Sequence, residues 1–305
     1  MSRPLRVTSA SGVGATKPVL TGTSGPMLSF IRLSLLVAGV LALAGAGAGA
    51  QEQPAAAPSP PQPPPAQAQP TPGLVPPVVY LPDKPEIEPR AVEILQAMSH
   101  RLASAKTLSF TSVATYESPA RTGQPLAYLV KSEILLERPD KLRIITPGDG
   151  PATELYYDGK TVMAYTPSAD MVAVAQAPPT IDEMLHAAYH YAAIYFPFTD
   201  VIVADPWADL SQRLRLAFVV GRSVVLDDIK TDIVVIADDN AQAQIWVGAE
   251  DHLPRMIRAT FFNEPGNFRH TAVFSDWRIN PKIPAGAFTS KKAAKAKRIP
   301  FAPPG

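Results

Sequence analysis

The sequence predicts an α+β protein in which an open antiparallel β-sheet has one face covered by a few helices. From Leu108 onward, most of the chain alternates apolar and polar residues over short segments, as half-buried strands do. Turn residues separate these segments by only a few positions, whereas parallel neighbours would need long crossovers. Two apolar stripes with helical spacing, at 91–106 and 180–196, supply the cover that the sheet requires.

Composition excludes several classes of protein. The 28 Lys+Arg and 27 Asp+Glu leave a net charge of +1, so the clustered basic excess of a nucleic-acid binder is missing. The absence of cysteine excludes disulfides, thiolate metal sites, a cysteine nucleophile and a lipidated N-terminal cysteine. Hydrophobic residues make up 46% of the chain, which is ample for a large core.

Residues 1–50 resemble a secretory signal. Basic residues precede the apolar run Leu33–Ala44, and Ala48-Gly49-Ala50 provides an A-x-A cleavage site. The run is shorter than the roughly 20 residues of a membrane-spanning helix, although a retained anchor is the alternative. We expect cleavage after Ala50 and release of a soluble protein, with Met27 as an alternative start to Met1.

A proline-rich linker is predicted at 51–84. Fourteen of the 39 residues from Gln51 to Pro89 are proline, which fixes φ, removes a hydrogen-bond donor and keeps such a segment extended. We expect 51–84 to be disordered and dispensable for stability, because it cannot bury enough apolar surface. The folded domain then covers 85–305 and ends in a basic tail.

The first half of the domain is predicted as one helix and a meander. Ala91, Leu95, Met98 and Leu102 form one helical face that ends near Lys106. Strands follow at 108–117, 127–137, 141–146, 154–158, 161–167 and 170–177. Asp158-Gly159 between two of them is typical of a hairpin turn.

The second half is predicted as a helix followed by further strands. Thr180 and Glu183 form a capping box, the apolar stripe runs to about 196, and Pro197 ends the helix. A short helix is expected at 205–212. Strands are expected at 214–221, 224–238, 243–250, 254–263 and 268–279, separated by turns such as Asp238-Asp239-Asn240.

Several spaced motifs carry a resemblance to a known family. RPDKLR (138–143), YYDGKTVMAY (156–165), APPTIDEML (177–185), QIWVGAEDHLPRM (244–256), FSDWRINPKIPAGAF (274–288) and KRIPFAP (297–303) occur in order. Together they resemble domain-of-unknown-function family 2092, predicted periplasmic proteins that are similar to the LolA/LolB-like and RseB-like group. The resemblance implies a periplasmic, LolA-like half-barrel: a curved sheet of about 10–11 strands wrapped around helices, with an apolar cavity between them.

The resemblance favours a non-enzymatic carrier, because members of the wider group carry lipoproteins or sense envelope stress. A lipid, acyl chain or acylated protein would occupy the apolar cavity. The alternatives are an envelope sensor or protein-interaction module, and a hydrolase without a readable motif. The candidate ligand-binding residues come from two strands and from the helix 180–196, which is either a movable lid or a fixed core helix: Leu108, Phe110, Tyr128, Val130, Ile134, Leu136, Met184, Leu185, Ala188 and Tyr191.

No catalytic or metal motif stands out, so we expect no cofactor and no enzyme activity. His186 and His190 are four residues apart, but the glutamate of HExxH is missing and Asp182 is the only nearby third ligand. There is no G-x-S-x-G and no P-loop.

Basic residues form three clusters. We expect Arg138, Lys141 and Arg143, and likewise Arg255 and Arg258, to face solvent along strands. The tail KKAAKAKR (291–298) has five positive charges and is expected to be solvated, with attraction to an anionic membrane surface as the sharper alternative. We expect no nucleic-acid partner and a monomer.

Overall fold

The computed structural model describes residues 81–148, 151–192, 194–262 and 267–301. Contacts within the chain separate a unit that contains all these residues from a second unit, Val40–Tyr80, which lies outside them. The predicted signal segment 1–50 and most of the predicted linker 51–84 therefore lie outside the described residues. Within the described part, no helix combines the length and apolar character needed to cross a membrane.

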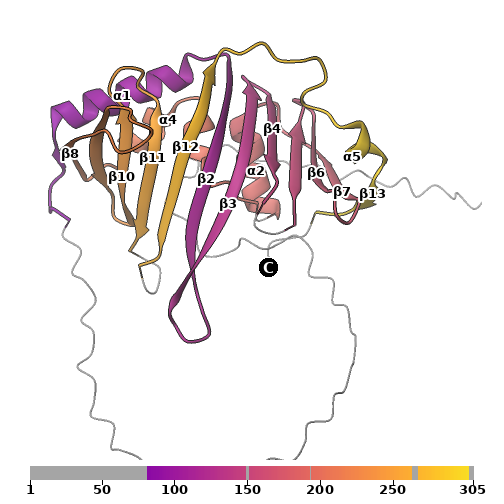
Figure 1. Cartoon of the computed structure of the whole chain (residues 1–305), viewed down its shortest axis with the longest axis horizontal. Coiled ribbons are helices and arrows are strands. Elements are labelled where there is room, and N and C mark those ends of the chain that lie inside the picture. The colour runs from indigo at the N-terminus through magenta and orange to yellow at the C-terminus, as the bar shows by residue number, and fades with distance from the viewer. Residues whose placement is uncertain (1–80, 149–150, 193, 263–266, 302–305) are drawn as a thin grey trace, which may run out of the picture. The chain divides into compact units, whose positions relative to one another are not determined.

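The described residues form one sheet of 13 strands in the order β1-β8-β9-β10-β11-β12-β2-β3-β4-β5-β6-β7-β13 (Figure 1). The strands are β1 (Glu86–Ile87), β2 (Thr107–Pro119), β3 (Pro125–Glu137), β4 (Lys141–Thr146), β5 (Thr153–Tyr157), β6 (Thr161–Thr166), β7 (Met171–Gln176), β8 (Leu216–Ser223), β9 (Thr231–Ala237), β10 (Ala241–Gly248), β11 (Pro254–Phe261), β12 (Arg269–Ile279) and β13 (Lys297–Ile299).

Two antiparallel meanders, β2–β7 and β8–β12, make up most of this curved sheet. They join because β12 returns to pair with β2, with Phe274 opposite Ser112. The end strands β1 and β13 pair in parallel with β8 and β7 and are not neighbours, so the sheet stays open. The predicted antiparallel sheet of 10–11 strands is confirmed by β2–β12, whereas the two parallel end strands were not predicted.

In the described part of the chain, five helices accompany the sheet: α1 (Pro89–Ala103), α2 (Ile181–Ala192), α3 (Thr199–Ile202), α4 (Pro206–Ser211) and α5 (Lys291–Lys295). The predicted face of α1 is buried, and Thr180 accepts a hydrogen bond from the Glu183 amide as the capping box requires. α2 ends at Ala192 rather than near 196, and α3 was not predicted. In Figure 1, α1 lies along one end of the strands, and α2 lies behind the sheet near β3 and β4.

Alternate residues of each strand face the helices and form one core. On β2 and β3 these are the even-numbered positions, where Leu108 is opposite Leu136 and Phe110 is opposite Ile134. All four are buried in the cluster that also contains the apolar side of α2. We call this helix-covered side the concave face and the opposite side the outer face.

The β2–β3 hairpin is longer than its neighbours. It pairs continuously from Thr107↔Glu137 to Pro119↔Pro125, while β4 has only six residues. The hairpin therefore extends beyond the adjacent strands (Figure 1). The concave face continues onto this extension, past the helices.

The structure corrects three predictions about individual segments. Residues 224–230 are a loop, not a strand, and Asp227 and Asp228 in it have positive φ. Arg255 is buried and paired with Asp251, and Arg138 donates to the Ile202 carbonyl at 2.9 Å, so neither simply faces solvent.

The predicted tail is ordered, although its five basic residues are exposed to solvent as expected. Residues 291–299 form α5 and β13, with Ala293 and Ala296 buried against Tyr165 and Val172. The Ser290 side chain caps α5 by accepting from the Ala293 amide. The basic residues are therefore carried by an ordered edge of the sheet.

Candidate functional site

The structure divides the ten predicted ligand-binding residues into two groups. One group is buried in a single cluster between sheet and helices: Leu108, Phe110, Ile134, Leu136, Met184, Leu185 and Ala188. The other three are partly or largely exposed: Val130, Tyr128 and Tyr191. The concave face thus has a closed part beneath the helices and an open part toward the hairpin tip.

Aromatic packing fills the closed part. The Phe110 ring stacks on Trp277 with centroids 4.3 Å apart and meets Phe274 and Phe198 edge-on at 5.9 and 6.0 Å. These rings come from β2, β12 and the turn before α3. Such pairs stabilise a core beyond their burial of apolar area.

Hydrogen bonds fix the start of α2 to its surroundings. The Ile181 amide donates to the Pro139 carbonyl at 2.8 Å, and the Ala204 amide donates to the Asp182 carboxylate at 3.1 Å. Met184 and Leu185, one turn further on, are 0% and 5% exposed. In this structure α2 is therefore a packed core helix, which is one of the two readings that the sequence left open.

An aromatic shelf lies at the open part: Tyr116, Tyr128 and His270 on β2, β3 and β12, together with Phe261 on β11, which is 4% exposed and belongs to the core cluster. Tyr116 and Tyr128 are stacked with centroids 5.4 Å apart, and Phe261 meets His270 edge-on at 4.9 Å. Tyr128 is opposite Tyr116, which is opposite His270, so these three rings form a row across three strands. Tyr128 is 43% exposed.

Apolar residues continue along β3 on both sides of the shelf. Leu126 and Val130 share the concave side with Tyr128, because side chains alternate and the pairing of β2 with β3 has no irregularity. Leu126 is 47% exposed. This open strip of Leu126, Tyr128 and Val130 has no charged side chain, and along β3 only Ser132 separates it from the buried Ile134.

A belt of small polar residues separates the two parts. Ser112 and Ser132 are opposite each other on β2 and β3, and both are buried. Ser132 Oγ lies 3.0 Å from Thr146 Oγ1, whereas Ser112 Oγ is buried without a hydrogen-bond partner among the described residues. Polar side chains therefore interrupt the apolar concave face at the boundary between its closed and open parts.

His270 makes the shelf sensitive to acid. Burial lowers the pKa of His270 to about 4, against the opposing effect of Glu117. The unfolded chain binds a proton near pH 6.5, so between pH 6.5 and 4 it holds more protons than the folded state, and stability falls as pH falls. We expect wild type to lose about 2–3 kcal/mol of unfolding free energy between pH 7 and pH 4 through this group.

The test compares urea denaturation of wild type and His270→Phe across that pH range. His270→Phe should remove this part of the pH dependence while leaving that of the carboxylates. An unchanged pH profile in the variant would show that His270 is solvated in the folded state.

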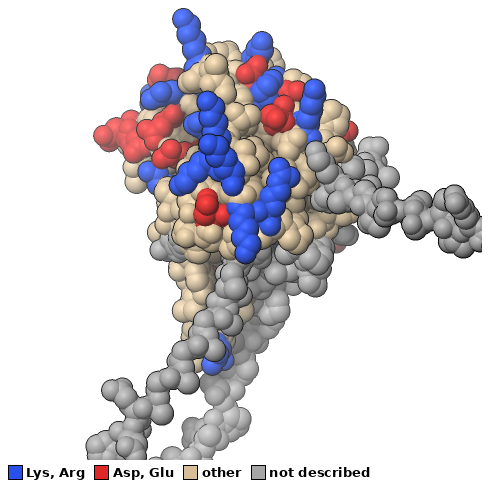
Figure 2. Space-filling model, turned by 90° about the vertical axis from the view of Figure 1, so that its right-hand side faces the viewer, with Lys and Arg blue, Asp and Glu red and all other residues tan. Residues whose placement is uncertain are grey.

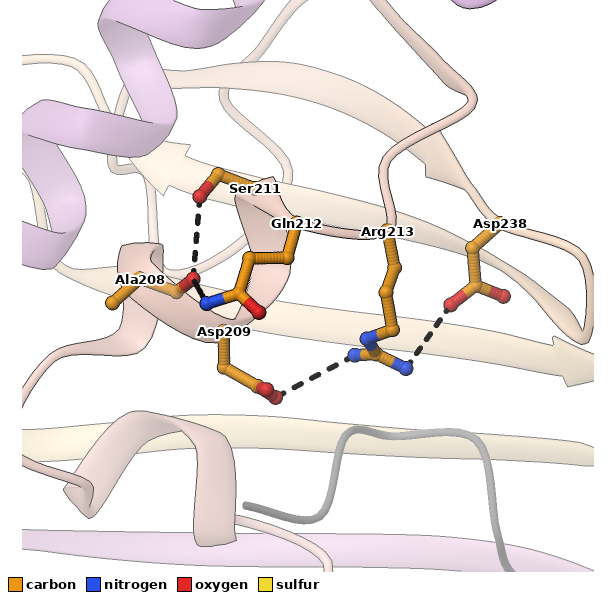
Figure 3. A network of polar contacts seen from close by, with 6 residues as sticks. All are labelled: Ala208, Asp209, Ser211, Gln212, Arg213 and Asp238. Atoms are coloured by element: carbon orange, nitrogen blue, oxygen red, sulfur yellow. Dashed lines mark hydrogen bonds and ion pairs between the residues drawn. The ribbon is translucent and has the colours of Figure 1, made fainter. Parts of the chain in front are cut away.

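Charged groups on the helix side hold α4 in place. Arg213 bridges Asp209 and Asp238 at 3.5 and 3.4 Å and so ties α4 to the β9–β10 turn (Figure 3). The pKa of the neighbouring Asp200 carboxyl is raised to about 8, chiefly by burial and also by the charge of Asp209, while a hydrogen bond from its own backbone and the charge of Arg213 act in the opposite direction. Asp200 is therefore mostly protonated at neutral pH and adds little negative charge beside the core.

The predicted half-site for a metal remains two histidines. The ring centroids of His186 and His190 lie 4.3 Å apart. Burial lowers the pKa of His186, and the nearby charge of His190 lowers it as well. Asp182 is engaged by the Ala204 amide. Among the described residues, no three His, Asp or Glu side chains are grouped as metal ligands.

Sequence reasoning missed Tyr116, Phe261, His270 and Leu126. Alternation along β2 places Tyr116 on the same side as Phe110, so that signal was present. Placing His270 beside it requires the pairing of β12 with β2, which joins residues more than 150 positions apart.

The fold is distantly similar to several solved structures. MucB is 12% identical with a TM-score of 0.37, over 69% of this chain and 65% of MucB, so the chain spans less than two thirds of that protein. A LolA superfamily protein from Nitrosomonas europaea is 10% identical with a TM-score of 0.32, over 66% of this chain and 97% of that one. A putative outer membrane lipoprotein-sorting protein domain from Vibrio parahaemolyticus is 10% identical with a TM-score of 0.32, over 65% and 96%.

The sequence itself identifies the family. No curated protein matches the chain. The family model described as "Predicted periplasmic protein (DUF2092)" matches residues 91–302, from the start of α1 to just beyond β13. This span includes both parts of the concave face and the edge segment α5–β13. The chain therefore belongs to the DUF2092 family of predicted periplasmic proteins.

Proposed function

We propose that the protein is a non-enzymatic periplasmic carrier or binding protein that holds an acyl chain of a lipid or lipoprotein on its concave face. The observation that carries this proposal is the open strip of Leu126, Tyr128 and Val130, which is apolar, uncharged and separated from the core only by the belt of Ser112 and Ser132. The acyl chain would lie along this strip and against the aromatic shelf. The closed part acts as a rigid support rather than as the binding cavity.

The energetics favour such a ligand. Each methylene buried against apolar side chains contributes about 0.8 kcal/mol, so ten methylenes could offset several kcal/mol of lost freedom. A charge placed on the strip would oppose binding, because it would have to be desolvated beneath the acyl chain. Binding is therefore sensitive to a charge on the concave side of β3 and insensitive to one on the outer side.

Leu126→Glu is expected to weaken acyl-chain binding at least tenfold, while Leu129→Glu leaves it unchanged. The two leucines lie on the same strand, are 47% and 49% exposed, and point to opposite faces. The measurement is displacement of a fluorescent fatty acid from delipidated protein. Both variants should keep the wild-type urea midpoint, since neither residue is buried.

Equal loss of binding in both variants would place the acyl chain elsewhere or show a nonspecific effect of charge. Failure of the delipidated wild type to bind any fatty acid would reject the proposal of a carrier.

A second candidate function, a protein-interaction module, has its own observation on the outer face. Ile233, Trp246, Met256, Val273 and Val113 are successive cross-strand partners on five neighbouring strands. Val273 and Val113 are 36% and 37% exposed. A partner protein could lie across this apolar row.

Native mass spectrometry of protein isolated from the periplasm separates the two candidates. A lipid-sized adduct that is lost in Leu126→Glu supports the carrier. A stoichiometric protein adduct that is retained in Leu126→Glu and lost in Val113→Glu supports the interaction module.

A further inference from the structure

Five cations are concentrated at one end of the sheet. Lys291, Lys292 and Lys295 lie on α5, and Lys297 and Arg298 lie on β13. All five residues are exposed, and none makes an ion pair with an acidic side chain among the described residues. Figure 2 views this end of the molecule and shows lysine and arginine side chains over its middle, with most acidic side chains nearer its rim.

The cations are held by an ordered scaffold. Ala293 and Ala296 pack beneath Tyr165 and Val172 on the outer side of β6 and β7. The Lys297 amide donates to the Asp170 carbonyl at 3.0 Å, and β13 continues the sheet beyond β7. The charges of this basic edge, α5–β13, are therefore fixed together without further loss of chain entropy on binding.

Protection of an exposed strand edge explains only part of this pattern. Lys297 and Arg298 lie on the end strand, where charge discourages pairing with another chain. The three lysines of α5 lie outside any strand, so edge protection does not require them. Asp170, next to this edge, accepts a hydrogen bond from the Tyr165 hydroxyl and forms no ion pair with the five cations.

We propose that the basic edge docks the protein onto an anionic phospholipid bilayer. A periplasmic protein lies between two membranes, and each basic residue close to an anionic surface strengthens binding roughly fivefold. The edge lies on the outer side of the sheet, so docking through it leaves the concave face free. This surface is independent of the acyl-chain site.

The test is co-sedimentation of the full exported chain with vesicles of phosphatidylcholine alone and of phosphatidylcholine mixed with phosphatidylglycerol. The edge variant replaces all five residues with glutamine. The control variant makes the same change at four lysines and one arginine that are also exposed and unpaired in the described residues but lie elsewhere: Lys84, Lys106, Lys131, Lys230 and Arg121. The two variants have equal net charge.

Wild type and the control variant should bind the phosphatidylglycerol vesicles, and the edge variant should bind at least a hundredfold more weakly. Binding by wild type should weaken steeply as salt is raised, because the interaction is screened. The edge variant should keep its melting temperature and its fatty-acid binding in solution, so failure here is distinct from failure of the carrier proposal. Equal binding by the two variants, or equal binding by wild type to both kinds of vesicle, would overturn the proposal.

Discussion

Leu185→Glu is expected to lower the free energy of unfolding by about 4 kcal/mol or more. Leu185 is 5% exposed on α2 and belongs to the main core cluster. Truncating a buried leucine costs about 2–5 kcal/mol, and a buried carboxyl adds desolvation or must stay protonated. The loss is a large fraction of the total stability of an ordinary domain.

Urea denaturation of wild type, Leu185→Glu and Leu129→Glu measures this effect. Leu129→Glu makes the same change at a leucine that is 49% exposed, so its expected cost is about 0.5 kcal/mol or less. If Leu185→Glu does not fold, Leu185→Ala should still show a loss of about 2–5 kcal/mol.

The outcome decides whether α2 is a fixed helix or a lid. A lid could open and leave the new carboxylate in water, so the cost would be only about 1–2 kcal/mol. The contacts of Ile181 with Pro139 and of Asp182 with Ala204 argue for a fixed start of the helix. A small loss in Leu185→Glu would mean that these contacts break during opening, and the closed part would then become the ligand site.

Local patterns in the sequence predicted the fold because each element depends mainly on its own residues. The face of α1 with Ala91, Leu95 and Met98 is buried as its spacing indicates. The turn at Asp158 is closed as expected, since its carboxylate accepts hydrogen bonds from the Lys160 and Thr161 amides. Gly159 adopts a φ of +91° there, which favours glycine.

Contacts between distant segments could not be predicted in the same way. Pairing of β12 with β2, and of the short β1 and β13 with the sheet edges, depends on which surfaces remain unpaired after the meanders form. The segment 291–298 resembled a solvated tail because its charge is visible in the sequence, whereas its burial is not. Ala293 and Ala296 are buried within it, and β13 pairs with β7, which its composition does not indicate.

The candidate site was predicted in part for the same reason. Alternation correctly placed Tyr128, Val130 and Ile134 on one side of a strand. It could not show that Ile134 is covered by helices while Tyr128 lies beyond them, because that depends on the length of the hairpin relative to its neighbours.

Phe110→Ala is expected to lower the free energy of unfolding by about 3–5 kcal/mol, the second large effect. Phe110 is 3% exposed and contacts the rings of Trp277, Phe274 and Phe198, so truncation removes three aromatic contacts and leaves a cavity. The matched control is Phe218→Ala, at a phenylalanine on β8 that is 39% exposed, with an expected cost under about 1 kcal/mol.

Urea denaturation and tryptophan fluorescence report on the same change. Loss of stacking exposes one face of Trp277, so the emission of the folded variant should shift, while Phe218→Ala leaves it unchanged. If Phe110→Ala costs no more than Phe218→Ala, the rings beneath the helices do not form a packed core. Phe110 would then line a space that an acyl chain can enter, and binding would have to be assigned to the closed part of the concave face instead of the open strip.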